Sequence, residues 1–327
     1  MFRSRFCGLL VASVLVSACG ATSPGSDGSG PASDETKVSV VASFYPLAFV
    51  AERIGGERVS VSNLTPPSVE PHDLELTTDQ VDRIEDSDVV IYLGGGFQPA
   101  LVGALQRRQA TTLDVSDGLA LVPGAAVELE AEEASAEDAS QEAEETAEEE
   151  ATLIDPHFWL NPLKLADAAD QIKDTLIKAD PEGAATYESS AKALRSDLTA
   201  LDGRFQAGLK DCARRELVTT HAAFFYLVDR YGLTQLPISG LSPENEPDPG
   251  RLAELADLIK VRGITTVFYE ELVPRDLADT LGRETGAKTA ELSPLEGLSE
   301  ETAAAGGNYI SVMDQNLTAI RAALSCP

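Results

Sequence analysis

The chain has 327 residues, of which 43 % are hydrophobic and 24 % are charged. It is therefore long enough for two folded domains, and its composition is not that of a disordered chain. The formal net charge is −29, from 25 basic and 54 acidic residues. Phosphate backbones repel so negative a chain, so nucleic acid is not an expected partner.

The N-terminus is typical of an export signal. Two arginines precede an apolar run over residues 7–16, which at about ten residues is too short to span a bilayer. Small residues then precede Cys19 and resemble the bacterial lipobox, in which the chain is cut before a lipidated cysteine. The alternative is an ordinary signal peptide that is cleaved near Ala18. We expect residues 1–18 to be removed and residues 19–36, rich in Gly, Ser and Pro, to form a flexible tether.

Short β-rich runs then alternate with amphipathic helical patterns. The predicted strands are Val38–Val41, Val59–Val61, Val89–Leu93, Thr111–Val115, Leu217–Thr219, Leu236–Ile238, Thr265–Phe268 and Lys288–Glu291. The predicted helices between the first four strands are Leu47–Ile54, Thr78–Glu85 and Pro99–Gln106. This alternation predicts an α/β fold with two lobes, residues 37–180 and 211–327, each with a mostly parallel sheet flanked by helices.

An acidic insert interrupts the first lobe at residues 126–151. Between Glu128 and Glu150 lie twelve acidic residues and no basic one. So high a charge with few apolar residues predicts a disordered loop. The loop is either simply solvated, or it raises the cation concentration near a binding site.

The clearest helical pattern joins the two lobes over residues 181–210. Asp180 is suited to cap this helix and Pro181 to its first turn. Apolar residues then recur at steps of three and four from Tyr187 to Leu209. From Pro181 to Leu209 the helix would be about 40 Å long. We expect a stiff linker that limits how far the lobes open and close.

Two cysteines remain if Cys7 is removed and Cys19 is lipidated. Export places Cys212 and Cys326 in an oxidising compartment, so we expect them to form a disulfide. The alternative is a pair of buried thiols.

The chain has only three histidines, and all of them lie in loops or at the ends of predicted strands. They are His72, His157 and His221. Open α/β sheets bind their ligands at the carboxyl ends of the strands. A structural role explains any single histidine, but three placed in this way indicate a metal site, and neutral imidazoles suit Zn²⁺.

The sequences around the histidines resemble the metal-binding solute receptors of zinc and manganese ABC transporters. The motifs are Glu-Pro-His-Asp, Asp-Pro-His-Phe-Trp-Leu-Asn-Pro and Thr-His-Ala-Ala-Phe-Phe-Tyr-Leu-Val-Asp-Arg-Tyr-Gly-Leu, with further similarity at residues 242–247, 267–270 and 308–317. The resemblance covers about residues 37–326 apart from the acidic insert. It implies two α/β lobes joined by a rigid helix, with His72 and His157 from the first lobe and His221 from the second around a metal ion.

The resemblance leaves the fourth ligand open. Histidine at the third position is typical of the zinc branch, because manganese receptors usually carry glutamate there. The family often supplies an aspartate after the last strand, where this chain has Ser293. We expect three histidines plus water, or a carboxylate such as Glu70 or Glu296. Glu270 is either the partner of an imidazole N–H or a helix-entry carboxylate.

The resemblance implies a receptor, not an enzyme, that captures Zn²⁺ outside the cytoplasm. It would act as a monomer anchored to the bacterial cell membrane through Cys19 and deliver the ion to a membrane permease. The alternatives are a manganese receptor of the same family, a tethered zinc hydrolase, and an adhesin or scaffold with a structural metal. Three histidines plus water are also a catalytic arrangement, but no short zinc-protease motif is present in the sequence.

Overall fold

The computed structural model describes residues 37–72, 74–106, 108, 111–124, 154–243, 247 and 249–327. The predicted signal peptide, Cys19, the tether and the acidic insert lie outside these described residues. Within the described ranges, the helices are all too short or too polar to cross a membrane.

The first sheet is wholly parallel. Its strands are β1 (Val38–Ala42), β2 (Val59–Asn63), β3 (Val89–Tyr92) and β4 (Thr111–Asp114), in the order β2-β1-β3-β4. The helices after the first three strands are α1 (Tyr45–Gly55), which leads into the 3-10 turn η1 (Gly56–Arg58), α2 (Thr78–Asp86) and α3 (Pro99–Leu105). Successive side chains of β1 point to opposite faces, so Val40 packs in a cluster with α1 while Val41 packs in a cluster with α2 and α3. Burial on both faces explains why β3 is a continuous apolar run and why β1 is apolar except for Ser39.

The second sheet repeats this arrangement. Its strands are β5 (Glu216–Thr219), β6 (Thr234–Pro237), β7 (Thr266–Tyr269) and β8 (Lys288–Glu291), in the order β6-β5-β7-β8. The helices are α8 (Phe225–Tyr231), α9 (Pro249–Arg262), α10 (Asp276–Thr285), α11 (Glu300–Ala304) and α12 (Tyr309–Leu324). In both sheets the second strand in sequence lies at the edge, beside the first, so the two sheets have the same strand order. The predicted α/β class, with two parallel sheets flanked by helices, is confirmed.

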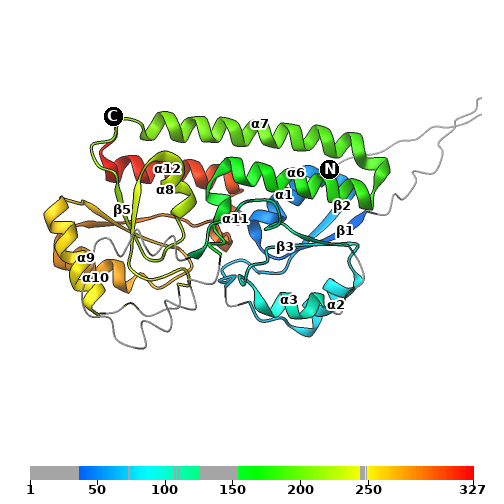
Figure 1. Ribbon diagram of the computed structural model, residues 1–327, viewed down its shortest axis with the longest axis horizontal. Coiled ribbons are helices and arrows are strands. Elements are labelled where there is room, and N and C mark those ends of the chain that lie inside the picture. The colour runs from blue at the N-terminus through cyan, green and yellow to red at the C-terminus, as the bar shows by residue number, and fades with distance from the viewer. Residues whose placement is uncertain are drawn as a thin grey trace, which may run out of the picture. The chain divides into compact units, whose positions relative to one another are not determined.

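Two long helices connect the sheets. After the 3-10 turn η2 (Phe158–Leu160) come α6 (Pro162–Ala179), a second turn η3 (Pro181–Gly183) and α7 (Ala184–Leu209). Where the periodicity predicts one helix from Pro181, the chain forms η3 and then α7, and the Asp180 carboxylate accepts a hydrogen bond from the Gly183 N–H at 3.1 Å. In Figure 1, α7 runs from α1 and α6 beside the first sheet to α12 beside the second.

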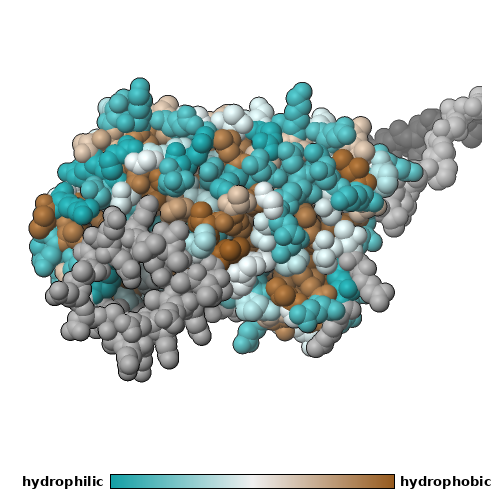
Figure 2. All heavy atoms as spheres, in the orientation of Figure 1, coloured by the Kyte–Doolittle hydropathy of each residue, from teal (hydrophilic) through white to brown (hydrophobic). Residues whose placement is uncertain are grey.

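The main hydrophobic core is shared by both sheets. It includes Val40 and Ile91 from the first sheet, Leu217 and Phe268 from the second, and Phe205 from α7. A continuous core of this kind stiffens the connection between the sheets. Among the described residues, the exposed large hydrophobic side chains are Val69 and Val261, and Figure 2 shows a mostly hydrophilic face with small, separate apolar patches.

The predicted disulfide is present. Cys212 follows α7 and Cys326 follows α12, and the bond joins positions 114 residues apart. The Arg214 N–H also donates to the Leu324 carbonyl at 3.1 Å. The C-terminus is therefore fixed to the end of the long connecting helix.

Candidate metal centre

Four side chains that could bind a metal ion converge between the two sheets. His72 lies between β2 and α2, and His157 lies between β4 and α6. His221 lies two residues after the end of β5, and Glu296 lies in the loop after β8. One ligand atom from each of these residues lies within 4.8 Å of all the others. The structure therefore brings together the three predicted histidines and one of the two carboxylates suggested for the fourth position.

The ligand atoms surround one carboxylate oxygen. Glu296 Oε1 lies 2.9 Å from His157 Nε2, 3.4 Å from His221 Nε2 and 3.7 Å from His72 Nε2. The His157 and His221 side chains are fully buried, Glu296 is 1 % exposed and His72 is 12 % exposed. His72 Nε2 and His221 Nε2 make no hydrogen bond to any described residue. Buried polar atoms left without a partner are costly, and a bound cation would satisfy both nitrogens at once.

Without a bound metal ion, the carboxylates and imidazoles of the site already stabilise each other's charged forms. Burial disfavours the charged form of both inner imidazoles, but the carboxylates beside them outweigh it and raise the pKa of His157 and of His221. Burial would also raise the pKa of Glu296, but its hydrogen bond with His157 and its close contacts with His221 and His72 hold that pKa well below the ordinary value. The site thus stabilises an anionic carboxylate among imidazoles.

His221 is oriented by Glu270, the residue directly after β7. Glu270 Oε2 lies 2.7 Å from His221 Nδ1, and Glu270 also accepts a hydrogen bond from the Thr220 hydroxyl. β5 and β7 are neighbours in the sheet, so their carboxyl ends bring the two side chains together. Of the two roles considered for Glu270, the structure shows the contact with an imidazole nitrogen.

His157 has the same kind of support from Asp155, a contact that the sequence analysis did not identify. Asp155 Oδ1 accepts from the His157 backbone N–H at 2.9 Å and lies 2.8 Å from His157 Nδ1. The Asp155 side chain is fully buried. The sequence feature that could have indicated this contact is the aspartate two residues before the histidine in the Asp-Pro-His motif. Both inner imidazoles therefore turn Nδ1 to a carboxylate and Nε2 to the centre, as metal-binding histidines commonly do.

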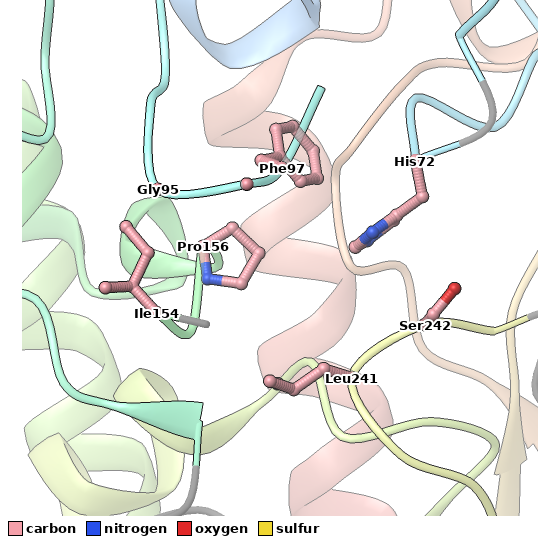
Figure 3. Close-up of a pocket in the computed structure, with 8 residues that line it drawn as sticks. His72, Gly95, Phe97, Ile154, Pro156, Leu241 and Ser242 are labelled. Atoms are coloured by element: carbon pink, nitrogen blue, oxygen red, sulfur yellow. The ribbon is translucent and has the colours of Figure 1, made fainter. Parts of the chain in front are cut away.

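His72 lies at the edge of the site. Its ring meets the edge of Phe97, with 4.7 Å between ring centroids, and the Gln98 side chain donates to the Pro71 carbonyl at 3.2 Å. Figure 3 shows the His72 imidazole directed into a small cavity whose lining includes Phe97 and Ser242. The volume of this cavity is about 50 Å³, enough for a water molecule or two.

The other predicted carboxylate, Glu70, is not among the four clustered groups. Its Oε1 accepts from the His72 backbone N–H at 3.3 Å. Burial and the nearby charge of Glu296 raise the pKa of Glu70 to about 10. Without a metal ion this shift favours the neutral form of Glu70, which does not favour it as an anionic ligand.

Ser293 takes part in its own loop and not in the cluster. Its hydroxyl accepts from the Leu295 N–H at 3.2 Å, and its backbone makes two hydrogen bonds with the Asn316 side chain. The carboxylate that enters the site comes three residues later, at Glu296. The sequence offered no pattern that distinguished these positions, because the loop has no helical or strand periodicity.

The residues that follow His157 also begin helix α6 and contact the loop after β8. Asn161 caps α6, since its side chain accepts from the Leu163 N–H at 3.0 Å, and Pro162 occupies the first turn. The Trp159 indole donates to the Pro294 carbonyl at 2.7 Å. A contact between residues 135 positions apart has no signal in a single sequence.

Two parallel β-sheets flanked and joined by helices, with side chains from both lobes that could bind a metal ion, define the class of two-lobed binding proteins. Residues 40–323 match the family described as zinc-uptake complex component A, periplasmic (ZnuA). The zinc-binding lipoprotein AdcA of Streptococcus pneumoniae serotype 4 is 36 % identical over 288 residues, which are 87 % of this chain and 55 % of AdcA. The high-affinity zinc uptake system protein ZnuA of Bacillus subtilis is 34 % identical over 330 residues, which cover 99 % of each chain.

A solved structure agrees with these sequence relationships. The Zn(II)-bound ZnuA-like domain of Streptococcus pneumoniae AdcA matches with a TM-score of 0.72 and 33 % identity, covering 88 % of this chain and 99 % of that domain. The chain thus spans about half the length of the AdcA relatives and the full length of their ZnuA-like domain. The chain belongs to the ZnuA family.

Proposed function

We propose that this chain is the extracytoplasmic zinc-binding receptor of an ABC transporter. It captures Zn²⁺ with His72, His157, His221 and Glu296 and passes the ion to a membrane permease. The observation that carries this proposal is the buried cluster of three imidazole Nε2 atoms around Glu296 Oε1. The names of the relatives AdcA and ZnuA support zinc as the ion.

The donor set favours zinc over manganese. Three imidazole nitrogens and one carboxylate oxygen make the four-coordinate set that Zn²⁺ commonly takes, while Mn²⁺ prefers more oxygen ligands. With Glu296 in the fourth position, water is not needed to complete the site. We therefore prefer Glu296 to the water ligand expected from the sequence.

The burial of the site favours transport over hydrolysis. A catalytic zinc ion needs an open coordination position and access for a substrate. Here the four side chains are between 0 and 12 % exposed. Burial of the ligand groups on this scale suits a bare ion as cargo.

Anchoring through Cys19 and docking on a permease are also part of the proposal. The names of the relatives include lipoprotein and uptake-system protein, and the N-terminal sequence has the small residues before Cys19 that lipidation requires. The tether would leave both lobes free to meet the permease.

The test is a metal titration of the full chain in detergent against a competing chelator. Trp159 is the only tryptophan, and its ring centroid lies 5.3 Å from that of His157, so its fluorescence reports on the site. We expect tight one-to-one Zn²⁺ binding, weaker Mn²⁺ binding, and a large loss of Zn²⁺ affinity in His221→Ala.

A matched pair of variants tests the fourth ligand. Glu296→Gln should weaken Zn²⁺ binding strongly, while Ser293→Ala should change it little, because only Glu296 points into the cluster. Equal Zn²⁺ affinity of the two variants would indicate that water, and not Glu296, is the fourth ligand. The absence of saturable Zn²⁺ binding by direct metal analysis would overturn the proposed function itself.

A further inference from the structure

The loop that carries Glu296 takes a path that its own sequence does not favour. Leu292 continues the sheet, since its N–H donates to the Tyr269 carbonyl at 2.9 Å. Three residues later Leu295 adopts a left-handed conformation, with a φ of 58°, while its side chain is fully buried. That conformation is uncommon for a branched residue and persists where the surrounding structure holds it in place.

Asn316 of α12 holds the start of this loop. Its Oδ1 accepts from the Ser293 N–H at 3.0 Å, and its Nδ2 donates to the Ser293 carbonyl at 2.7 Å. The side chain therefore pairs with the loop backbone as a neighbouring strand would. Asn316 is only 3 % exposed, so water does not readily replace these two bonds.

Trp159 holds the same loop from the other lobe. Its Nε1–H donates to the Pro294 carbonyl at 2.7 Å, one residue from Leu295 and two from Glu296. The Trp159 carbonyl in turn accepts from the Tyr309 hydroxyl at 2.6 Å. Since Trp159 is also two residues after His157, one short segment sets the position of both a histidine and the carboxylate 2.9 Å from it.

We propose that Trp159 and Asn316 are positioning residues for Glu296, fixing its carboxylate in the metal site by holding the backbone at Pro294 and Ser293. The inference rests on the proposed zinc-binding function. It assigns to these two side chains a role in metal affinity that acts through Glu296, in addition to any role in folding.

A double-mutant cycle tests this inference with Zn²⁺ as the probe. Trp159→Phe removes the donor and keeps an aromatic ring, and Asn316→Leu removes both polar atoms of the amide at similar size. Each is made in the native chain and in Glu296→Gln, and affinity is measured on the full chain in detergent by competition with a coloured chelator. We expect about a 10- to 100-fold loss in the native background, and little further loss when Glu296 is already replaced.

Tyr187→Phe is the matched control. It also removes one hydrogen bond of a buried aromatic residue, the 2.7 Å bond from the Tyr187 hydroxyl to Asp180 on the connecting helices, and should leave Zn²⁺ affinity unchanged. An equal loss of affinity in both Glu296 backgrounds would show that Trp159 and Asn316 act only through general stability and would overturn the inference.

A spectroscopic measurement separates positioning from folding. Co²⁺ absorption reports the ligand set directly, so Asn316→Leu should shift the Co²⁺ spectrum towards that of Glu296→Gln. A native spectrum in both positioning variants would also overturn the inference. If the native chain binds Zn²⁺ and His221→Ala does not, the proposed function stands even when this inference fails.

Discussion

At the residue scale, the two inner histidines share one arrangement. Asp155 contacts Nδ1 of His157 at 2.8 Å, and Glu270 contacts Nδ1 of His221 at 2.7 Å. Each carboxylate fixes the orientation of its ring and turns Nε2 towards Glu296 and the position of the proposed metal ion. His72, at the edge, has its ring against Phe97.

Removing the charge of a supporting carboxylate should weaken zinc binding. Glu270→Gln and Asp155→Asn keep the size of the side chain but make it a weaker acceptor, so we expect about a 10-fold or larger loss of Zn²⁺ affinity. Chelator competition measures this loss. Glu254→Gln, the same change beside Arg251 on α9, is the control and should bind zinc normally. Equal affinities of Glu270→Gln and Glu254→Gln would contradict the supporting role.

Zinc binding should release protons at neutral pH. The pKa values of His157 and His221 are raised above the ordinary value, so protons compete with the metal until the pH exceeds those raised values. Affinity should therefore increase as the pH rises through this range. Calorimetric titration at pH 7 in two buffers of different ionisation enthalpy measures the protons released. The same binding enthalpy in both buffers would rule out this coupling.

At the scale of elements, α7 is the connection on which both sheets depend. Its buried face consists of Tyr187, Ala191, Leu194, Leu198, Leu201, Asp202, Phe205 and Leu209. Asp202, although charged, is satisfied by Arg230 of α8 at 2.8 Å and by the Tyr231 hydroxyl at 3.0 Å. The helix is thus held to the second lobe by a partly buried ion pair as well as by apolar packing.

Truncating the buried face of α7 should cost stability without changing the metal site. Leu198 is fully buried, so Leu198→Ala should lower the free energy of unfolding by about 2–5 kcal/mol. Lys192→Ala, on the exposed face of the same helix, should change it by less than about 0.5 kcal/mol. Urea denaturation measures both variants. A loss of Zn²⁺ affinity in folded Leu198→Ala would show instead that the helix controls the site.

The start of α7 should contribute an acid-sensitive part of the stability. The hydrogen bond from Arg58 is the main cause that lowers the pKa of Asp180 from 3.8 to about 2. The folded pKa lies below the unfolded value, so this stabilisation is complete above pH 3.8 and is lost as the pH falls through about 2. Asp180→Asn should therefore be less stable than the native chain at pH 5, by a difference that shrinks below pH 3.8. Urea denaturation across this range checks the sign, and a difference that grows with acidity would contradict it.

At the scale of the whole molecule, the proposed metal ion is a link between the lobes. His72 and His157 come from loops of the first sheet, and His221 and Glu296 from loops of the second. Hydrogen bonds also cross between the lobes, among them that of the Tyr226 hydroxyl, which donates to the Asp155 carbonyl at 3.0 Å. Such contacts favour a stiff connection, in which capture of the proposed ion needs local movement around the site more than wide opening.

Zinc should accordingly raise the stability of the entire fold. A ligand that binds only the folded chain adds about 2.7 kcal/mol at a free concentration 100 times its dissociation constant. We expect chelator-buffered Zn²⁺ to raise the melting temperature of the native chain, and to have little effect on His221→Ala. Calorimetry with and without the metal measures the shift. An equal shift in His221→Ala would place the stabilising ion at another site.

The sequence by itself determined the strands, the connecting helix and the histidines. Apolar runs of strand length and the three- and four-residue periodicity of α7 are local patterns, so the eight strands of the described residues and the course of α7 could be predicted from them, whereas α6 was not. The scarcity of histidine, together with the motifs around each one, pointed to His72, His157 and His221, which the structure brings together.

Only the tertiary structure decided which groups complete and support the site. Ser293 and Glu296 lie in one irregular loop, and the left-handed turn at Leu295 and contacts from distant segments determine which of them enters the cluster. The pKa values of Glu70 and Glu296 also shift in opposite directions, because burial and the charge of Glu296 raise the first, while contacts with the histidines outweigh burial and lower the second. Such choices depend on long-range packing and electrostatics, which act only once the chain has folded.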